Sequence, residues 1–484
     1  MKILNLSILA IITFLTILFY DSNNVVGMEM CTLGMLLFNI IYSIQNIKKR
    51  FIFLAFQITF LSFLLGDNLA VLLEVGEGVF TKVIEEEFNT ETQLYIYLLL
   101  FISLFGVFIG YSLNERKKIS ESSAKIEIDS EYITQLRKYS KRFMYFFSIF
   151  ALSLTIEKAI FVQATGYVEY YTTYTSVLPP FFHRFEALYE TSLYLFLATF
   201  PRWKECRIPL LLYFLIGLFS LGYGQRNGFV LNTLFLCIYF SIRHLYKVYG
   251  DSEVWVNKKR ILSLFIAAPF LVFFLYSYGS TRVDSEAKNY NNPINNTLAF
   301  FAQQGGSVRI IGYEKDFSDK GIFPKDVPPY TFGYIIDLYQ QNALFKALNI
   351  YPTYKAQTVD LAMKGHNFGN TITYLYDSRY YFAGMGLGSC YIAEVHHDFG
   401  IIGVFIINLI YGLLFSLLYR YALNNTWYLF LCFLTIMNIL YAPRSGALLF
   451  INNLLAPTFL IFILIIYLLT EKYKKIKLSK LKQN

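Results

Sequence analysis

The apolar run at residues 94–112 decides the fold, and it reads LYIYLLLFISLFGVFIGYS. It contains no charged residue, and it is close to the roughly 20 residues that a helix needs to cross the hydrocarbon core of a bilayer. The whole chain of 484 residues has the same character, with 56% apolar and 15% charged residues. Soluble domains are about 45–50% apolar and about 25% charged. The composition therefore predicts a polytopic membrane protein and excludes a soluble enzyme, a disordered scaffold and a disulfide-stapled secreted module.

Similar apolar segments follow one another along the chain, and each is predicted to be a membrane-spanning helix. The expected fold class is thus an all-α polytopic membrane protein with about 12 transmembrane helices. The twelve segments are 3–20, 26–45, 51–73, 94–112, 142–164, 185–200, 208–223, 228–241, 261–278, 399–419, 426–441 and 447–470. The seventh and eighth are short and are joined by residues 222–227. They form either a tight helical hairpin or a re-entrant pair.

Lysine and arginine residues alternate between the predicted loops. Basic clusters occupy every second loop and the C-terminal tail, at 48–50, 113–141, 202–207, 258–260 and 472–482. Cytoplasmic loops carry such an excess, so both termini are predicted to be cytoplasmic. The basic residues behind the net charge of +9 lie mostly in these predicted cytoplasmic loops, so we expect no nucleic-acid partner. The five cysteines form no CxxC pair, so neither a disulfide framework nor a metal site is predicted.

The predicted spans divide one integrated membrane domain into three consecutive parts. Residues 1–278 hold nine helices, and residues 399–484 hold three helices and the basic tail. Between them, residues 279–398 form a polar insertion that is too long for a connector. The alternation of charge places this insertion outside the cytoplasm, and its amphipathic aromatic stretches predict short helices packed on the membrane surface.

Arginine residues on the predicted external side are few. Arg226, Arg282 and Arg444 lie at span ends beside glycine or proline, and Arg309 follows the sequence QQGGSV at 303–308. Arginine on the external side is contrary to the positive-inside rule, and burying its charge within the bilayer costs free energy. Guanidinium groups bind phosphate oxygens bidentately, so these positions suit a phosphate site. The alternative is snorkelling or structural ion pairing.

A second group of polar residues lies at 391–400, YIAEVHHDFG, just before the tenth span. If this stretch is helical, Glu394 lies one turn from His397 and Asp398. A carboxylate beside an imidazole is a workable general base. The alternative is a polar helix cap with solvated histidines. A metal site is not expected, because adjacent histidines diverge on a helix and HExxH spacing is absent.

Several short motifs now combine into a family resemblance. They are GQRN at 224–227, QGGS at 304–307, the run 384–400 with its GS, IAE and DFG elements, and PRS at 443–445. Their order and the large late loop resemble the Wzy-type O-antigen and capsule repeat-unit polymerases, in the branch that includes the enterobacterial common antigen polymerase. The resemblance covers roughly residues 140–460. The doubled-arginine loop pattern of some O-antigen polymerases is absent, so their two-loop binding model is not transferred.

The resemblance implies a polymerase in the bacterial inner membrane, acting at the extracytoplasmic face. It would transfer the growing glycan from undecaprenyl diphosphate to a sugar hydroxyl of an incoming repeat unit on the same lipid. It further implies an inverting, metal-independent glycosyltransferase with a GT-C-like fold and no cofactor. A polysaccharide chain-length regulator is an expected partner.

This chemistry assigns expected roles to the residues above. Glu394 is the expected catalytic base, with His397 second. The expected ligands of the diphosphate are Arg226, Arg282, Arg309, Arg444, Gln304, Gly305, Gly306 and Ser307. The competing functions are a flippase or transporter of lipid-linked oligosaccharides and an O-antigen ligase. The one-sided loop and motifs favour the polymerase, and a purely structural membrane protein leaves the external arginines unexplained.

Overall fold

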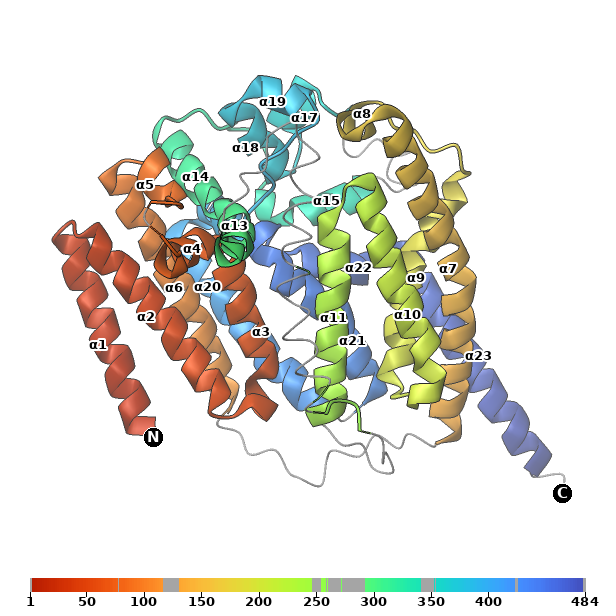
Figure 1. Cartoon of the computed structure of the whole chain (residues 1–484). Helices are drawn as coiled ribbons and strands as arrows, with labels where there is room; N and C mark the ends of the chain where they lie inside the picture. Colours follow the sequence, from red (N-terminus) through yellow and green to blue (C-terminus); the bar gives the residue numbers. More distant parts are fainter. Residues whose placement is uncertain are drawn as a thin grey trace. The chain divides into compact units, whose positions relative to one another are not determined.

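The computed structural model describes residues 2–76, 78–115, 130–245, 254–257, 259, 271, 292–340, 352, 354–422 and 425–481 (Figure 1). These residues form helices, and no strand occurs among them. A bilayer offers no water to pair with backbone N–H and C=O groups, so a helix, which satisfies them internally, is the natural element for this composition. The predicted all-helical, polytopic membrane fold is confirmed.

Seven of the described helices are long and apolar enough to cross a membrane, and the number is nine if two bent pairs each count as one span. The seven are α2 (Val25–Ile44), α6 (Thr90–Glu115), α7 (Glu131–Thr165), α10 (Trp203–Ser220), α11 (Arg226–Leu245), α20 (Tyr391–Ala422) and α21 (Thr426–Tyr441). α1 (Lys2–Asp21) and α9 (Pro180–Ala198) lie at two further predicted spans. The predicted span 261–278 falls, except for residue 271, outside the described residues. The count of twelve therefore stays a prediction.

Two predicted spans are bent helix pairs. The span predicted at 51–73 consists of α3 (Ile47–Leu64) and α4 (Gly66–Leu73), which meet at 79°. α4 packs on α13 (Pro293–Gly305) so closely that a Cβ on Gly66 would lie 2.2 Å from the Phe301 carbonyl oxygen. The last predicted span consists of α22 (Leu449–Leu455) and α23 (Pro457–Leu481), bent by 52°. Proline at the start of α23 has no N–H to continue α22, so the break falls there.

The chain forms two compact units, and each is discontinuous in sequence. Unit 1 comprises Met1–Lys118, Pro269–Tyr419 and Asn438–Leu449. Unit 2 comprises Ile119–Ala268, Arg420–Met437 and Phe450–Asn484. Their boundaries differ from the three consecutive parts expected at 1–278, 279–398 and 399–484. That division describes membrane topology and stays a prediction.

Buried amides and small residues hold the long helices of unit 1 together. The Asn39 side-chain amide on α2 donates to the Gln57 Oε1 atom of α3 and to the Leu104 carbonyl of α6, both at 3.2 Å. α6 and α20 approach closely, because a Cβ on Gly110 would lie 2.0 Å from the Leu409 carbonyl oxygen. Small residues and interhelical hydrogen bonds are the usual means of packing membrane helices. This packing fixes α20, whose first turn carries Glu394.

The described part of the predicted external insertion forms short helices, as expected. After α13 come η3 (Gly306–Val308), α14 (Arg309–Asp319), η4 (Tyr330–Phe332), α15 (Gly333–Gln340), α17 (Val359–Lys364), α18 (Phe368–Tyr376) and α19 (Ser378–Phe382). The side chains of Asn292, Thr358, Asn367 and Asp377 cap four of these helices by accepting hydrogen bonds from first-turn amides. Such caps define short helices that are too brief to be stable on their own.

The tenth predicted span begins earlier than its apolar run. The expected start is residue 399, whereas α20 begins at Tyr391 and includes the Glu394–His397 stretch in its first turns. The backbone at Gly400 is not helical, with φ 63° and ψ −161°, so α20 has a kink where the apolar run starts. Residues with a side chain rarely adopt this conformation, and glycine adopts it freely.

Unit 2 is built around α7, which lies against α9 and α10. Phenylalanine rings fill the contacts; for example, the Phe147 ring lies 5.7 Å from that of Phe185 and 5.6 Å from that of Phe462. α10 and α11 lie side by side, and η2 (Leu221–Tyr223) and Gly224, with φ 83°, join them (Figure 1). The two helices form a tight hairpin, and each is long and apolar enough to cross a membrane.

Candidate functional site

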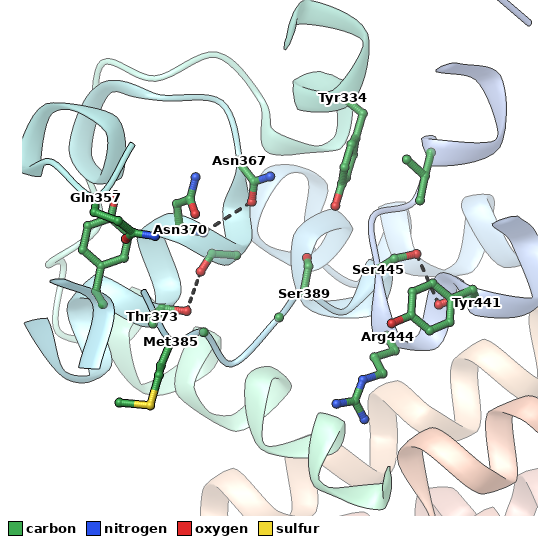
Figure 2. Close-up of a pocket in the computed structure, with 15 residues that line it drawn as sticks. Tyr334, Gln357, Asn367, Asn370, Thr373, Met385, Ser389, Tyr441, Arg444 and Ser445 are labelled. Atoms are coloured by element: carbon green, nitrogen blue, oxygen red, sulfur yellow. Dashed lines mark hydrogen bonds between the residues drawn. The ribbon is translucent and has the colours of Figure 1, made fainter. Parts of the chain in front are cut away.

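A polar pocket of about 330 Å³ lies within unit 1 (Figure 2). One side comes from α18 and the chain after α19, and the other from the end of α21 and from η5 (Ala442–Arg444). Its polar lining includes Tyr334, Asn370, Thr373, Ser389, Arg444 and Ser445. The volume falls in the range of roughly 300–1,000 Å³ that small-molecule sites occupy. This pocket joins residues from the predicted external insertion with the PRS motif.

Arg444 lines this pocket from η5, and its Nη1 atom donates a hydrogen bond of 2.8 Å to Gln304 Oε1. The contact joins two of the motifs on which the family resemblance rests. It forms because η5 and η3 both pack against α3. Two residues that were expected to share a ligand are therefore in direct contact, and Gln304 orients the guanidinium.

The QGGS turn has a second arginine beside it. A Cβ on Gly306 would lie 3.4 Å from Arg309 Nη2. Arg309 Nη1 is 3.6 Å from Glu87 Oε1 at the end of α5 (Val83–Glu87), and Arg309 Nε is buried without a hydrogen-bond partner. The turn between Gln304 and Ser307 thus lies next to two guanidinium groups.

The structure supplies a packing reason for the first glycine of this turn. A Cβ on Gly305 would lie 2.5 Å from the Asp67 backbone nitrogen and 2.9 Å from that of Gly66. Any side chain at this position would collide with the first turn of α4. Gly305 therefore permits two helices to touch, a reason that differs from the expected approach of a diphosphate to its backbone.

Glu394 lies behind the wall of the pocket and is 1% exposed. Its Oε2 accepts a hydrogen bond of 2.7 Å from the Ala447 amide, and its Oε1 accepts one of 3.4 Å from the Ser389 hydroxyl. Ser389 lines the pocket, whereas Glu394 is not among its lining residues. Glu394 therefore holds the turn that follows Arg444 and reaches the pocket through one hydroxyl group.

His397 and Asp398 have different surroundings from Glu394. The His397 ring packs against aromatic rings, with its centroid 4.2 Å from that of Phe323 and 5.4 Å from that of Tyr330. Asp398 accepts hydrogen bonds from the Tyr330 and Thr331 amides at 3.1 and 2.6 Å, and so caps η4. Neither residue lines the Arg444 pocket. The turn that carries Glu394 and His397 is helical, which was the condition for their sharing a face, but the two side chains contact different groups.

A buried cluster beside His397 was missed by the sequence reasoning. Glu314 on α14 is 0% exposed and shares a hydrogen bond with His396 Nδ1, while His396 Nε2 lies 2.7 Å from the Tyr95 hydroxyl of α6. Burial raises the pKa of Glu314, but hydrogen bonds from His396, His397 and Ser318 and the charge of His396 outweigh it, so this pKa lies below its ordinary value. The available signal was a lone acid on the helix face that buries Ile310 and Ile311.

The remaining predicted arginines are not brought to this pocket by the described contacts. Arg226 opens α11 in unit 2, directly after Gln225, whose carbonyl accepts a hydrogen bond of 3.1 Å from Ser220 Oγ. Unit 2 is described by itself, so a site shared by Arg226 and Arg444 stays a prediction. Arg282 lies outside the described residues.

Comparison with known proteins identifies the family of the chain. No curated protein and no solved structure matches it. A family model described as O-antigen polysaccharide polymerase Wzy matches residues 1–477, a range that includes the GQRN, QGGS and PRS motifs and nearly all of both units. The chain therefore belongs to the Wzy family of O-antigen polysaccharide polymerases.

Proposed function

We propose that this polymerase transfers the growing glycan from undecaprenyl diphosphate to a sugar hydroxyl of an incoming lipid-linked repeat unit, at the extracytoplasmic face. Family membership supplies the coarser part, which is O-antigen polymerisation by a multi-pass glycosyltransferase of the inner membrane acting on lipid-linked repeat units. The flippase and ligase alternatives are not favoured by this match. The observation that carries the finer part is that Arg444 lines a polar pocket while its guanidinium is hydrogen-bonded to Gln304.

The transfer is a single displacement in this proposal. The acceptor hydroxyl oxygen forms a bond to the anomeric carbon of the donor glycan, and the bond from that carbon to the diphosphate oxygen breaks. The diphosphate leaves with the electron pair, and the anomeric configuration inverts. Arg444 and Arg309 stabilise the charge that develops on the diphosphate, with Gln304, Gly306 and Ser307 forming the turn between them. Arg226 and Arg282 are proposed as further ligands of the same group.

The acceptor proton leaves through Ser389 and Glu394 in this proposal. Ser389 lines the pocket and donates its hydroxyl hydrogen to Glu394. The Ser389 oxygen takes the proton of the acceptor hydroxyl, and the original Ser389 proton passes to the Glu394 carboxylate. His397 stays the second candidate for the base. It does not line the Arg444 pocket and its ring packs against Phe323, which makes it the less favourable choice.

The proposal also covers the orientation of the protein in the membrane, its protein partners and its branch of the polymerase family. The alternating basic loops support cytoplasmic termini, with the pocket on the opposite face. A chain-length regulator is proposed as a partner, because the motif resemblance implies one. The motif resemblance favours the branch of the enterobacterial common antigen polymerase, which is narrower than the family match and stays a prediction.

The experiment is complementation of a strain that lacks this gene, with surface polysaccharide resolved on a gel. An Arg444→Ala variant is expected to give single repeat units without a ladder, and Arg444→Lys a short ladder, because lysine keeps the charge and loses the bidentate fork. The control is Arg379→Ala, whose side chain is 92% exposed and pairs with Asp377 outside the pocket. A normal ladder from an Arg444→Ala protein that is present in the membrane at the native level contradicts the proposed site.

Metal independence has its own test. Arginines are proposed to meet the charge of the diphosphate, so purified enzyme in detergent is expected to polymerise lipid-linked repeat units equally well with and without excess EDTA. Loss of activity on EDTA treatment, restored by Mg²⁺ or Mn²⁺, shows instead that a metal ion meets this charge.

A further inference from the structure

Unit 2 contains a second cavity, of about 250 Å³, which the proposed reaction does not use. The middle of α7 and of α9 line it together with the last turn of α10, η2 and the first turns of α11, so it lies toward the η2 end of the α10–α11 hairpin. Its polar lining comprises Thr155, Glu186, Tyr189, Glu190, Ser220 and Asn232. By the alternation of basic loops, this end of the hairpin is the external one.

Glu190 is the unusual residue of this cavity. It lies on α9 directly before a run of fully buried residues, Thr191 to Ala198, yet its own side chain is exposed. Within the described part of the chain, its carboxylate forms no hydrogen bond and no ion pair, while Glu186 one turn earlier lies 3.7 Å from Lys158 Nζ. A carboxylate in an apolar helix is costly and normally has a partner. An unpaired one that opens into a polar cavity points to a ligand.

The lining determines what that ligand offers. Thr155 Oγ1 donates to the Ala151 carbonyl at 2.8 Å, Ser220 Oγ to the Gly217 carbonyl at 2.6 Å, and Asn232 Nδ2 to the Tyr213 carbonyl at 3.1 Å. The Thr155 and Ser220 hydroxyls therefore have their hydrogens engaged and keep lone pairs, while Asn232 keeps one N–H and its Oδ1. A ligand that donates hydrogen bonds is favoured, and a phosphate, which accepts them, is disfavoured.

Tyr189 adds a group that both donates and accepts. It is 2% exposed, and its hydroxyl is buried with no hydrogen-bond partner. Unpaired buried hydroxyls cost free energy, so a partner supplied by a ligand offsets that cost. Hydroxyl groups of a sugar act as both donors and acceptors and fit a lining of carboxylates, phenols and lone pairs.

We propose that this unit 2 cavity binds one sugar residue of the lipid-linked substrate, with the Glu190 carboxylate accepting hydrogen bonds from its hydroxyl groups. The volume lies a little below the roughly 300–1,000 Å³ of whole-ligand pockets, which suits a single residue of an oligosaccharide. The inference rests on the proposed function for the identity of the substrate. It assigns sugar recognition to unit 2 and diphosphate recognition to the Arg444 pocket of unit 1.

The experiment measures binding by the full-length protein in detergent to two separate probes. The first is the free repeat-unit oligosaccharide, released from its lipid by mild acid, and the second is undecaprenyl diphosphate without sugar. Glu190→Gln is expected to weaken oligosaccharide binding about tenfold, because a charge-assisted hydrogen bond becomes a neutral one. The same variant is expected to bind undecaprenyl diphosphate normally, whereas Arg444→Ala shows the reverse pattern.

The two proposals fail differently in this experiment. Unchanged oligosaccharide binding by Glu190→Gln overturns the sugar site and leaves the Arg444 site intact. Unchanged undecaprenyl diphosphate binding by Arg444→Ala overturns the Arg444 site and leaves the sugar site intact. Glu157→Gln, a change on α7 of an acid that accepts hydrogen bonds from Ser176 and Val177, controls for loss of a nearby charge. Binding of Ca²⁺ or Mg²⁺ by the native protein, lost in Glu190→Gln while oligosaccharide binding persists, also overturns the proposal in favour of a cation site.

Discussion

At the scale of single residues, the buried Glu394 carboxylate is connected to the pocket through the Ser389 hydroxyl. Glu394 is fully enclosed and holds the Ala447 amide, so it organises the turn after Arg444 whether or not it takes a proton. Ser389 is the group that is both in the pocket and in contact with Glu394. The two roles of Glu394 can be separated by substituting the hydroxyl.

We expect Ser389→Ala to slow polymerisation while the protein still folds, because it removes the hydroxyl and leaves the Ala447–Glu394 bond. Glu394→Gln is expected to slow it by roughly 100-fold, the lower range for loss of general base catalysis. Initial rates of polymer formation by purified protein test both. Ser62→Ala, a half-buried serine on α3 whose hydroxyl donates to the Ile58 carbonyl one turn earlier, is the control. A Ser389→Ala enzyme with the native rate eliminates the hydroxyl relay.

The Glu314 cluster predicts a dependence of stability on pH. The pKa of Glu314 lies below its ordinary value of 4.5, so the native state favours the carboxylate. That stabilisation is complete above the ordinary pKa and is lost as pH falls through the lowered one. Thermal unfolding in detergent between pH 5 and pH 3 is expected to show a steeper loss for the native protein than for Glu314→Gln. Asp316→Asn on the same helix, which removes a carboxylate and leaves an amide oxygen to accept from Thr92, is expected to keep the native slope.

At the scale of elements, the contact of α4 with α13 decides where the QGGS turn lies. Gly66 and Gly305 face the other helix's backbone at distances that leave no space for a side chain. η3 follows directly, and Arg309 begins the next helix. The bend of 79° between α3 and α4 therefore helps to place the QGGS turn, which lies beside Arg309 and Arg444.

Gly305→Ala is expected to destabilise the protein, because its methyl group would lie 2.5 Å from the Asp67 backbone nitrogen. Overpacking of this kind costs about 1–3 kcal/mol, which lowers the melting temperature in detergent. Gly34→Ala in the middle of α2 is the matched control, because a Cβ there has no atom within 4 Å. An unchanged melting temperature for Gly305→Ala shows that α4 and α13 separate at little cost.

At the scale of the whole molecule, the orientation in the membrane decides which substrates reach the pocket. Lipid-linked repeat units presented outside the cytoplasm reach it only if the insertion at 279–398 is external. The basic loops predict this orientation, and single exposed positions in each unit allow it to be tested.

In intact cells, a membrane-impermeant maleimide is expected to label Lys364→Cys in the insertion and not Lys204→Cys at the start of α10. Lys364 is 64% exposed, Lys204 is also exposed, and both lie in described segments. The native chain gives the background, since Cys31, Cys206, Cys390 and Cys432 are buried and Cys237 is half-buried. Labelling of Lys204→Cys without labelling of Lys364→Cys would show that the predicted orientation is wrong and that the pocket faces the cytoplasm.

The sequence by itself determined the helical membrane fold, the positions of most helices, the short helices of the insertion and the family, because apolar length and local motifs are properties of contiguous residues. Only the tertiary structure decided that Arg444 contacts Gln304, that Gly305 serves helix packing, that Glu394 lies behind Ser389, and that Glu314 pairs with His396. It also decided that α20 begins before its apolar run. The physical reason is that burial and pairing depend on which distant segments pack together, and no local pattern encodes that choice.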